Sequence, residues 1–423
     1  MLRVNDLELL PMSSPVQSLD VLDPVNIEDP YPLFEALRTH NPVYQIPGTE
    51  IYWVSDRAQI EEALNRHDVF SANLTGVLMT DSAGSPVVFE LSAFGSAVDA
   101  IANADEPDHA VHRKLVLPGV RPGRIAEMES AIRSRAQREI DALVSHQGGD
   151  WIERVANPIP TQAMAQVVGL PLEDADKLLE WAMSGTEILA GTTRPDRMQE
   201  IASATADLSQ YLSDRLEEAL AAGPSSPVPG IISDLADGVQ AGQIKREMAV
   251  SILVVLAGAG GESTAGLLGN AARLLALNPQ VQQELRETPS LIPRFVEEVL
   301  RLESPFKGHY RVSLQETRLG ETHIPAGSRL LLLWAAANRD PDRFPHPNQI
   351  DLHRKNPQDH LSFGRGIHFC IGARLARLEA RVVLEELLAR TRILELNPDA
   401  PPRHVPSIFV RRLETLPLRM AAR

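Results

Sequence analysis

Apolar residues recur at helical spacing over most of the chain. Between about Ala110 and Asp237 this pattern predicts several helices, separated by proline- and glycine-rich breaks such as Gly223 to Pro227. One longer helix is expected from Lys245 to about Leu277, because an Asn-Pro pair follows it. Two further helices are predicted, one that carries Phe295 to Arg301 and one that starts just after Cys370.

Strand signals are fewer. Ile51 to Val54 is a short apolar run between turns, and Arg329 to Trp334 follows a turn at Ile324 to Gly327. The stretch from Ser71 to Ala104 is rich in Gly, Ser and Thr and has weak periodicity, which predicts a long loop with a short helix. We therefore expect a mainly α fold with minor β, in a single large domain that spans residues 1–423. Residues 1–28 are expected to form an extended or poorly ordered N-terminal segment.

Composition and charge narrow the class of protein. Hydrophobic residues make up 43% of the chain, enough for a large core, and the formal net charge is −15. This charge argues against nucleic acid as the main partner, since contact with phosphates needs a basic face. The longest mostly apolar run, Met248 to Gly261, falls short of the roughly 18 to 20 residues that cross a bilayer. The amino terminus lacks the pattern of a secretory signal. We expect a cytoplasmic monomer with no membrane partner.

Cys370 is the one cysteine of the chain. A lone cysteine is usually an inert buried thiol, but Gly364 and Gly366 precede this one and Gly372 follows it, directly before a predicted helix. Glycine permits positive φ and lets a flat group lie close to the backbone. The N–H groups at a helix amino terminus favour a thiolate over a thiol. A thiolate bound to haem iron promotes cleavage of dioxygen, whereas an inert core cysteine needs none of these features.

The stretch around Cys370 resembles the cysteine-loop signature of the cytochrome P-450 family. The matching positions are Phe363, Gly364, Gly366, His368, Cys370, Gly372 and Ala373. The resemblance spans roughly Asp29 to the carboxyl terminus and implies the cytochrome P-450 fold with a haem b (iron protoporphyrin IX) cofactor. It also implies that Cys370 is the ligand to the iron, with Phe363, Gly364 and Gly372 in contact with the haem.

Glu298-Val299-Leu300-Arg301 resembles the family's Glu-x-x-Arg pair beneath the haem. Glu35 to Arg38 satisfies the same short pattern and is interpreted as a surface pair on a helix. Pro341-Asp342-Arg343-Phe344 resembles the family's Pro-x-Arg-Phe element. The resemblance thus implies a buried ion-pair cluster of Glu298, Arg301 and Arg343, since buried charges must be paired. A surface turn at Arg343 is the alternative.

His109 and Arg113 stand four residues apart at the start of a predicted helix and share one face. In the family, these positions bind the haem propionates, together with an arginine and the histidine of the cysteine loop. In this chain those two residues are Arg311 and His368. A dianionic ligand would explain why four donors converge, whereas a lone His/Arg pair is otherwise an ordinary solvated face.

The long central helix carries three glycines between Gly258 and Gly261, directly before Glu262-Ser263-Thr264. Each glycine costs about 1 kcal/mol relative to alanine in a helix, and close helix packing is one explanation for them. The resemblance offers another, a distal helix that opens beside the iron and carries an acid and an alcohol that conduct protons to dioxygen. Glu262 would be the proton source. Ser263, where the family usually has threonine, would donate a hydrogen bond to dioxygen, and Thr264 matches the residue that follows.

The resemblance also implies a substrate pocket and partners. The pocket is expected to use mostly apolar side chains from four segments, namely Phe89, Leu91, Phe94, Ala257, Phe306, Ile408 and Phe409. Such a lining favours a hydrophobic or amphipathic small molecule, into which one atom of O2 would be inserted. No cysteines remain for an iron–sulfur cluster, so a separate ferredoxin-type electron donor is implied. Arg365, Arg374 and Arg377 are candidates for docking it, with a solvated helix face as the alternative.

Two other functions stay open at this point. The chain could be a peroxide-driven or non-oxygenating haem-thiolate enzyme on the same fold, or a haem-binding sensor without turnover. Glu262 and Ser263 argue against both, because a proton relay serves the activation of dioxygen.

Overall fold

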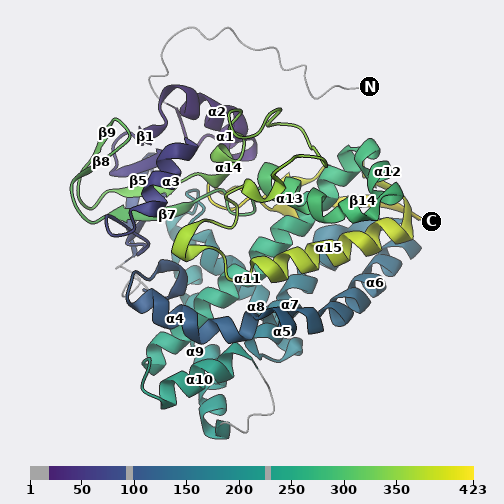
Figure 1. Ribbon diagram of the computed structural model, residues 1–423, viewed down its shortest axis with the longest axis horizontal. Helices are drawn as coiled ribbons and strands as arrows, with labels where there is room; N and C mark the ends of the chain where they lie inside the picture. The colour runs from purple at the N-terminus through teal and green to yellow at the C-terminus, as the bar shows by residue number, and fades with distance from the viewer. Residues whose placement is uncertain (1–18, 92–98, 224–229) are drawn as a thin grey trace.

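Helices form most of the structure, and most of the strands lie together at one side of the helical body (Figure 1). The computed structural model describes residues 19–91, 99–223 and 230–423. The prediction of a mainly α fold with minor β is confirmed.

The helices of the described ranges share a body that surrounds α11. They are α1 (Pro24–Glu28), α2 (Tyr31–His40), α3 (Arg57–Asn65), α4 (Asp108–Val116), α5 (Pro122–Glu127), α6 (Glu129–Ser145), α7 (Pro158–Val168), α8 (Ala175–Glu187), α9 (Met198–Ala222), α10 (Ile231–Gln240), α11 (Arg246–Leu277), α12 (Pro279–Glu287), α13 (Ile292–Leu302), α14 (Trp334–Ala337) and α15 (Ala373–Arg390).

The strands form one larger sheet and several small ones. They are β1 (Val43–Gln45), β2 (Ile51–Val54), β3 (Phe70–Ser71), β4 (Gly76–Thr80), β5 (Pro86–Glu90), β6 (Gly148–Asp150), β7 (His309–Ser313), β8 (Thr317–Leu319), β9 (Thr322–Ile324), β10 (Arg329–Leu332), β11 (Thr391–Leu396), β12 (Arg403–His404), β13 (Leu413–Thr415) and β14 (Pro417–Ala422). The five-stranded sheet has the order β1-β2-β10-β7-β3. Its strand β7 carries His309 and Arg311, so the sheet positions both side chains.

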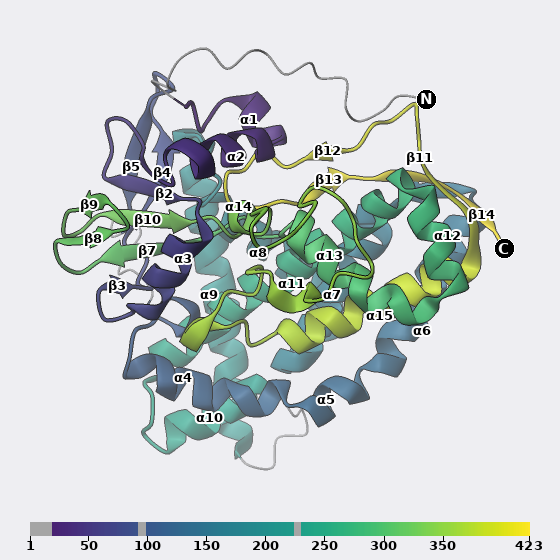
Figure 2. The same cartoon turned by 45° about the horizontal axis from the view of Figure 1, so that its top comes forward.

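α11 passes through the centre of the molecule and packs against α7, α8, α9, α13 and α15 (Figure 2). Its bounds agree with the helix predicted from Lys245 to Leu277. By length and composition it is the one helix in the described ranges that could cross a membrane. The mostly apolar run from Met248 to Gly261 covers only part of this helix. Its contacts with the surrounding helices account for this apolar composition, because a core helix is hydrophobic all round.

Two glycines of α11 allow this close packing. A Cβ at Gly260 would lie 2.8 Å from Cγ of Met164, and a Cβ at Gly261 would lie 3.3 Å from Oγ1 of Thr161. Both neighbours belong to α7. The structure therefore supports close helix packing as a reason for these glycines.

Two local expectations are wrong. The loop expected between Ser71 and Ala104 contains the antiparallel hairpin of β4 and β5. The two strands pair with each other and not with the larger sheet. Each strand is short, so its alternation of apolar and polar residues is hard to recognise among the surrounding Gly and Ser residues. Within residues 1–28, the last five form helix α1 rather than an extended segment, capped by the carboxylate of Asp23.

Candidate functional site

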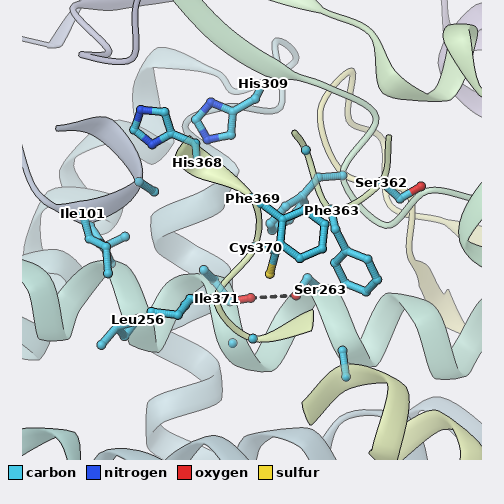
Figure 3. Close-up of a pocket in the computed structure, with 18 of the residues that line it drawn as sticks. Ile101, Leu256, Ser263, His309, Ser362, Phe363, His368, Phe369, Cys370 and Ile371 are labelled. Carbon is cyan, nitrogen blue, oxygen red and sulfur yellow. Dashed lines mark hydrogen bonds between the residues drawn. The ribbon is translucent and has the colours of Figure 1, made fainter. Parts of the chain in front are cut away.

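A cavity with a volume of about 260 Å³ lies between the loop that carries Cys370 and the middle of α11. Figure 3 shows the sulfur of Cys370 directed from its loop toward the helix that carries Ser263. Many of the residues named from the sequence line this cavity, and they come from α4, α11, the segment that leads into β7, β7 itself and the cysteine loop. They are His109, Arg113, Ser263, Thr264, Phe306, Arg311, Phe363, Gly364, His368 and Cys370, and Gly372 also lines it.

The cysteine loop is shaped by two glycines. Gly364 has φ +66° and Gly366 has φ +72°, a conformation that side chains with a Cβ rarely adopt. The backbone N–H of Cys370 donates to the carbonyl of Phe363 at 2.8 Å and closes the loop. α15 begins three residues after Cys370, at Ala373. The loop thus presents the sulfur to the cavity at the start of a helix.

Two opposing effects act on the Cys370 thiol. Its low-polarity surroundings raise its pKa, while the backbone N–H groups of Gly372 and Ala373 lower it. The helix amino terminus therefore acts in the direction expected from the sequence, but desolvation is the larger effect. A cation on the cavity side would shift the balance to the thiolate, because a bound metal ion deprotonates a coordinating thiol.

Four nitrogen-bearing side chains line the cavity next to this loop. The ring centroids of His109 and His368 lie 4.2 Å apart, and Nη1 of Arg113 donates to the carbonyl of Phe369 at 2.9 Å. Arg311 is buried and bonds to the carbonyl of Tyr310 at 2.6 Å. Desolvation lowers the pKa of Arg311 to about 10 and that of His368 to about 2. Burial therefore opposes the charged forms of Arg311 and His368, and an anion in the cavity would favour them.

Two buried nitrogen atoms in this cluster have no hydrogen-bond partner among the described residues, namely Nε2 of His109 and Nδ1 of His368. Nδ1 of His109 lies 3.0 Å from the carboxylate of Glu106. Buried polar atoms without partners call for an explanation. An anionic group in the cavity would satisfy both nitrogens together with Arg113 and Arg311. The residues present therefore fit a haem, with a sulfur ligand for iron and donors for its two propionates.

Ser263 and Thr264 face the cavity from α11, whereas Glu262 does not. The hydroxyl of Ser263 donates to the carbonyl of Ala259 at 2.7 Å, and the helix is continuous there, so the expected opening is not seen as a break. Glu262 is buried on another face, where it pairs with Nε of Arg412 at 2.6 Å and accepts from the hydroxyl of Thr186. Burial raises the pKa of Glu262, and Arg412 opposes this effect. The acid and the alcohol are therefore adjacent in sequence but turned apart.

The buried ion-pair cluster differs from the expected one in one member. Arg301 pairs with Glu298 at 2.8 Å as expected, and the third residue is Arg354, whose Nε lies 2.9 Å from Oε1 of Glu298. The expectation for Arg343 is wrong, since its side chain is 48% exposed and pairs with Asp359. Arg343 occupies a surface turn, which was the alternative interpretation. The other Glu-x-x-Arg match, on α2, places Arg38 against the carbonyl of Ala336.

Of the residues expected in the substrate pocket, Phe306 is the one in the described ranges that lines the cavity. Phe409 lies behind Phe306 with ring centroids 5.1 Å apart, and Ile408 packs against Gly191. Phe89 and Leu91 pack around the β4–β5 hairpin and do not line the cavity, and Phe94 lies outside the described residues. The expectation for Ala257 is wrong, because its side chain is buried in the core formed with α7, α8 and α9.

The sequence could have identified the residues of α11 that line the cavity where Ala257 was expected. Counting back from Ser263 by four and by seven gives Ala259 and Leu256, which share its helix face. Both line the cavity, as do the apolar residues Ile101, Met164, Val168, Ile231 and Val255. His309 also lines it, and burial lowers the pKa of this histidine to about 4. The part of the wall formed by these residues is therefore apolar apart from the imidazole of His309, whereas the charged side chains gather beside the cysteine loop.

Comparison with known proteins gives one consistent result. The family model described as "Cytochrome P450" matches residues 196–415. The chain is 40% identical over 396 residues to cytochrome P450 144 of Mycobacterium tuberculosis, which covers 93% of this chain and 89% of that protein. It is 30% identical over 410 residues to cytochrome P450 130 of the same organism, covering 93% and 96%.

Solved structures that resemble this chain are also cytochromes P450. P450BioI in complex with acyl carrier protein ligated to hexadec-9Z-enoic acid is similar, with a TM-score of 0.82, 28% identity, and coverage of 94% of this chain and 99% of that one. CYP109E1 of Bacillus megaterium in complex with testosterone is similar with a TM-score of 0.81, 27% identity, and coverage of 94% and 99%.

Proposed function

Because the chain belongs to the cytochrome P450 family, we propose that it is a haem-thiolate monooxygenase that inserts one atom of O2 into a hydrophobic or amphipathic small molecule. The observation that carries the proposal is that Cys370, Arg311 and Ser263, from three distant parts of the chain, line one cavity. When bound, haem b supplies the reductive activation of O2, in which the second oxygen atom leaves as water.

The residues that would hold the haem divide into two groups. Cys370 would be the ligand to the iron, with Phe363, Gly364 and Gly372 against the macrocycle. The propionates would accept hydrogen bonds from His109, Arg113, Arg311 and His368. This proposal is supported by the buried nitrogens of the two histidines, which have no partner among the described residues, and by the burial of Arg311. Charge-assisted bonds of this kind are among the stronger hydrogen bonds in proteins.

Ser263 and Thr264 would handle protons at the cavity. A hydroxyl can donate to one partner while accepting from another, so Ser263 can turn from the carbonyl of Ala259 and donate into the cavity. Glu262 would store a proton at its carboxylate, since burial raises its pKa. Because this carboxylate faces Arg412 and Thr186, delivery to Ser263 needs a side-chain rotation or a connecting water molecule.

The lining of the cavity supports the substrate class. Aliphatic side chains of α7, α10 and α11 form much of its wall, and Phe306 closes one side. His309 is uncharged at neutral pH and could receive or donate one hydrogen bond from a polar group of the substrate. A similar structure holds testosterone and another an acyl carrier protein loaded with a fatty acid, which are an apolar and an amphipathic ligand.

A separate ferredoxin-type protein would supply electrons at the face of the cysteine loop. Phe369 is 42% exposed there, and Arg113 joins the loop to α4, which exposes Val111 and Lys114. Arg374 is exposed in the first turn of α15, directly after the loop. Arg365 and Arg377 are already paired with Glu61 and Glu297. An apolar centre with basic side chains around it suits an acidic partner.

The test is product formation by the purified holoprotein with a compound that shifts its haem spectrum. We expect turnover with NAD(P)H, a surrogate ferredoxin and its reductase under O2, and much slower turnover with peroxide alone. Equal turnover with peroxide would show a peroxide-driven enzyme, and spectral binding with no product under either condition would show a haem-binding sensor.

A further inference from the structure

A second cavity opens at the surface between α13 and α15, next to the segment Pro357–Asp359. Its volume is about 370 Å³, several times the roughly 30 Å³ that one water molecule occupies in the liquid. Four arginines line it, namely Arg294, Arg374, Arg377 and Arg381, together with one acid, Glu297. The lining thus carries an excess of positive charge in a protein whose net charge is −15.

Among the residues that the structure describes, carboxylates balance two of these arginines. Arg377 forms two hydrogen bonds to Glu297, at 2.7 and 2.9 Å, and Arg381 pairs with Glu129 and Glu385. These bonds fix the two guanidinium groups in place at the wall of the cavity.

The other two arginines have no such balance. Arg294 donates from Nε and Nη2 to the carbonyls of Leu352 and Arg354, both at 2.5 Å, which orients its guanidinium without neutralising it. Arg374 is exposed, and no hydrogen bond or ion pair of its guanidinium is found among the residues that the structure describes. Two uncompensated charges therefore face one cavity, and their mutual repulsion is unfavourable unless an anion enters.

We propose that this cavity binds a phosphate-bearing small molecule. Guanidinium groups match the oxygens of phosphate with paired hydrogen bonds, and a phosphate offers three acceptor oxygens where a carboxylate offers two. Three oxygens suit Arg294, Arg374 and the remaining donors of Arg377. The volume exceeds that of one phosphate group, so the ligand has room for a second phosphate or a small organic part.

The site is distinct from the cavity of Cys370. Arg377 separates the two, since its guanidinium lies 4.5 Å above the ring of Phe363, which lines the Cys370 cavity. The phosphate ligand would therefore bind beside the cysteine loop without entering the substrate space.

The experiment is calorimetric titration of the holoprotein with inorganic phosphate and with pyrophosphate, in a phosphate-free buffer of constant ionic strength. We expect saturable binding at one site, tighter for pyrophosphate. Arg374→Gln should weaken binding about tenfold, as expected for the loss of a charge-assisted pair, and Arg374→Glu should abolish it. Arg138→Gln, at an exposed arginine on α6 outside the cavity, is the matched control and should bind like the parent.

Arg374 is exposed, so its variants should keep the parent's melting temperature, which checks that they fold. Absence of saturable heat with both probes would overturn the proposal, as would binding that Arg374→Gln leaves unchanged. Loss of ferredoxin affinity in Arg374→Gln without any phosphate binding would assign the cavity to the docking of a protein partner instead, and would equally overturn it.

Discussion

Arg354 donates a hydrogen bond from its Nε to Oε1 of Glu298 across 2.9 Å, and both side chains are buried. Arg301 contacts the same carboxylate, so one buried acid holds two arginines. One carboxylate cannot neutralise two guanidinium groups, and backbone carbonyls around the cluster balance part of the remaining positive charge. The carbonyl of Pro345, for example, accepts a hydrogen bond from Arg354. This arrangement ties the irregular segment before the cysteine loop to α13.

Removing Arg354 should therefore be far more damaging than removing Arg343. Breaking a buried ion pair leaves a partner uncompensated and typically costs about 3–5 kcal/mol. Arg343 forms a surface pair, which is worth about 1 kcal/mol or less. We expect Arg354→Ala to lose both thermal stability and haem, and Arg343→Ala to resemble the parent. Equal melting temperatures and equal haem content in the two variants would contradict this account.

Ser263→Ala should uncouple electron consumption from product formation. The substitution removes one hydrogen-bond donor, worth about 1 kcal/mol, so the ratio of product to NAD(P)H should fall about fivefold while hydrogen peroxide rises. Substrate affinity and the haem spectrum should change little. Ser263→Thr should retain or improve coupling, and serves as the matched control. If Ser263→Ala is as well coupled as the parent, Thr264, which also lines the cavity, becomes the better candidate for the relay alcohol.

Glu262→Gln should slow turnover while preserving the volume of the side chain. If the carboxylate refills the proton chain, its loss should reduce kcat by about tenfold or more. The solvent isotope effect on kcat should rise at the same time, a readout that mere loss of the Arg412 pair would not move. Glu247→Gln, at an exposed acid in the first turn of the same helix, should leave kcat unchanged. An unaltered kcat in Glu262→Gln would exclude this acid from proton delivery.

Glu379 should make stability depend on pH. It is buried between α15 and α6, its Oε2 has no hydrogen-bond partner in the described ranges, and burial raises its pKa from 4.5 to about 8. The folded state thus binds a proton more tightly than the unfolded state, so this contribution to stability is full below pH 4.5 and is lost as pH rises toward 8.

Glu379→Gln should abolish that dependence, because the amide stays neutral. At pH 8 the variant should be more stable than the parent by on the order of 1 to 3 kcal/mol, measured by denaturant unfolding from pH 5 to 9. Glu395→Gln, at an exposed acid on β11, is the control. A parent and a Glu379→Gln variant with parallel curves across this range would refute the prediction.

Local patterns in the sequence predicted the longer helices, and the motifs that resemble the family predicted much of the site. α11 begins within one residue of its predicted start and ends where predicted, and the spacing of His109 and Arg113 does place both on one face toward the cavity. The glycines around Cys370 mark a loop whose backbone only glycine readily adopts. These features depend on neighbours within a few residues, which a sequence displays directly.

The structure differs from the expectations where a partner lies far away in the chain. Glu262 turns from the cavity because Arg412, 150 residues later, pairs with it. Arg354 rather than Arg343 reaches Glu298 because the path of an irregular segment, not its motif, decides which arginine is buried. Ala257 differs by a single position from the lining residue Leu256, and one step along a helix turns a side chain by about 100°. Such choices depend on tertiary packing.

The most direct test of the account is the spectrum of the reduced, carbon monoxide-bound protein. Cys370 is the one cysteine of the chain and its sulfur faces the cavity. We predict one haem per chain and a thiolate-type Soret band in the folded parent. Cys370→Ser should lose that band even where some haem is retained. An imidazole-type band in freshly reduced, folded parent protein, or a thiolate-type band that persists in Cys370→Ser, would contradict the assignment.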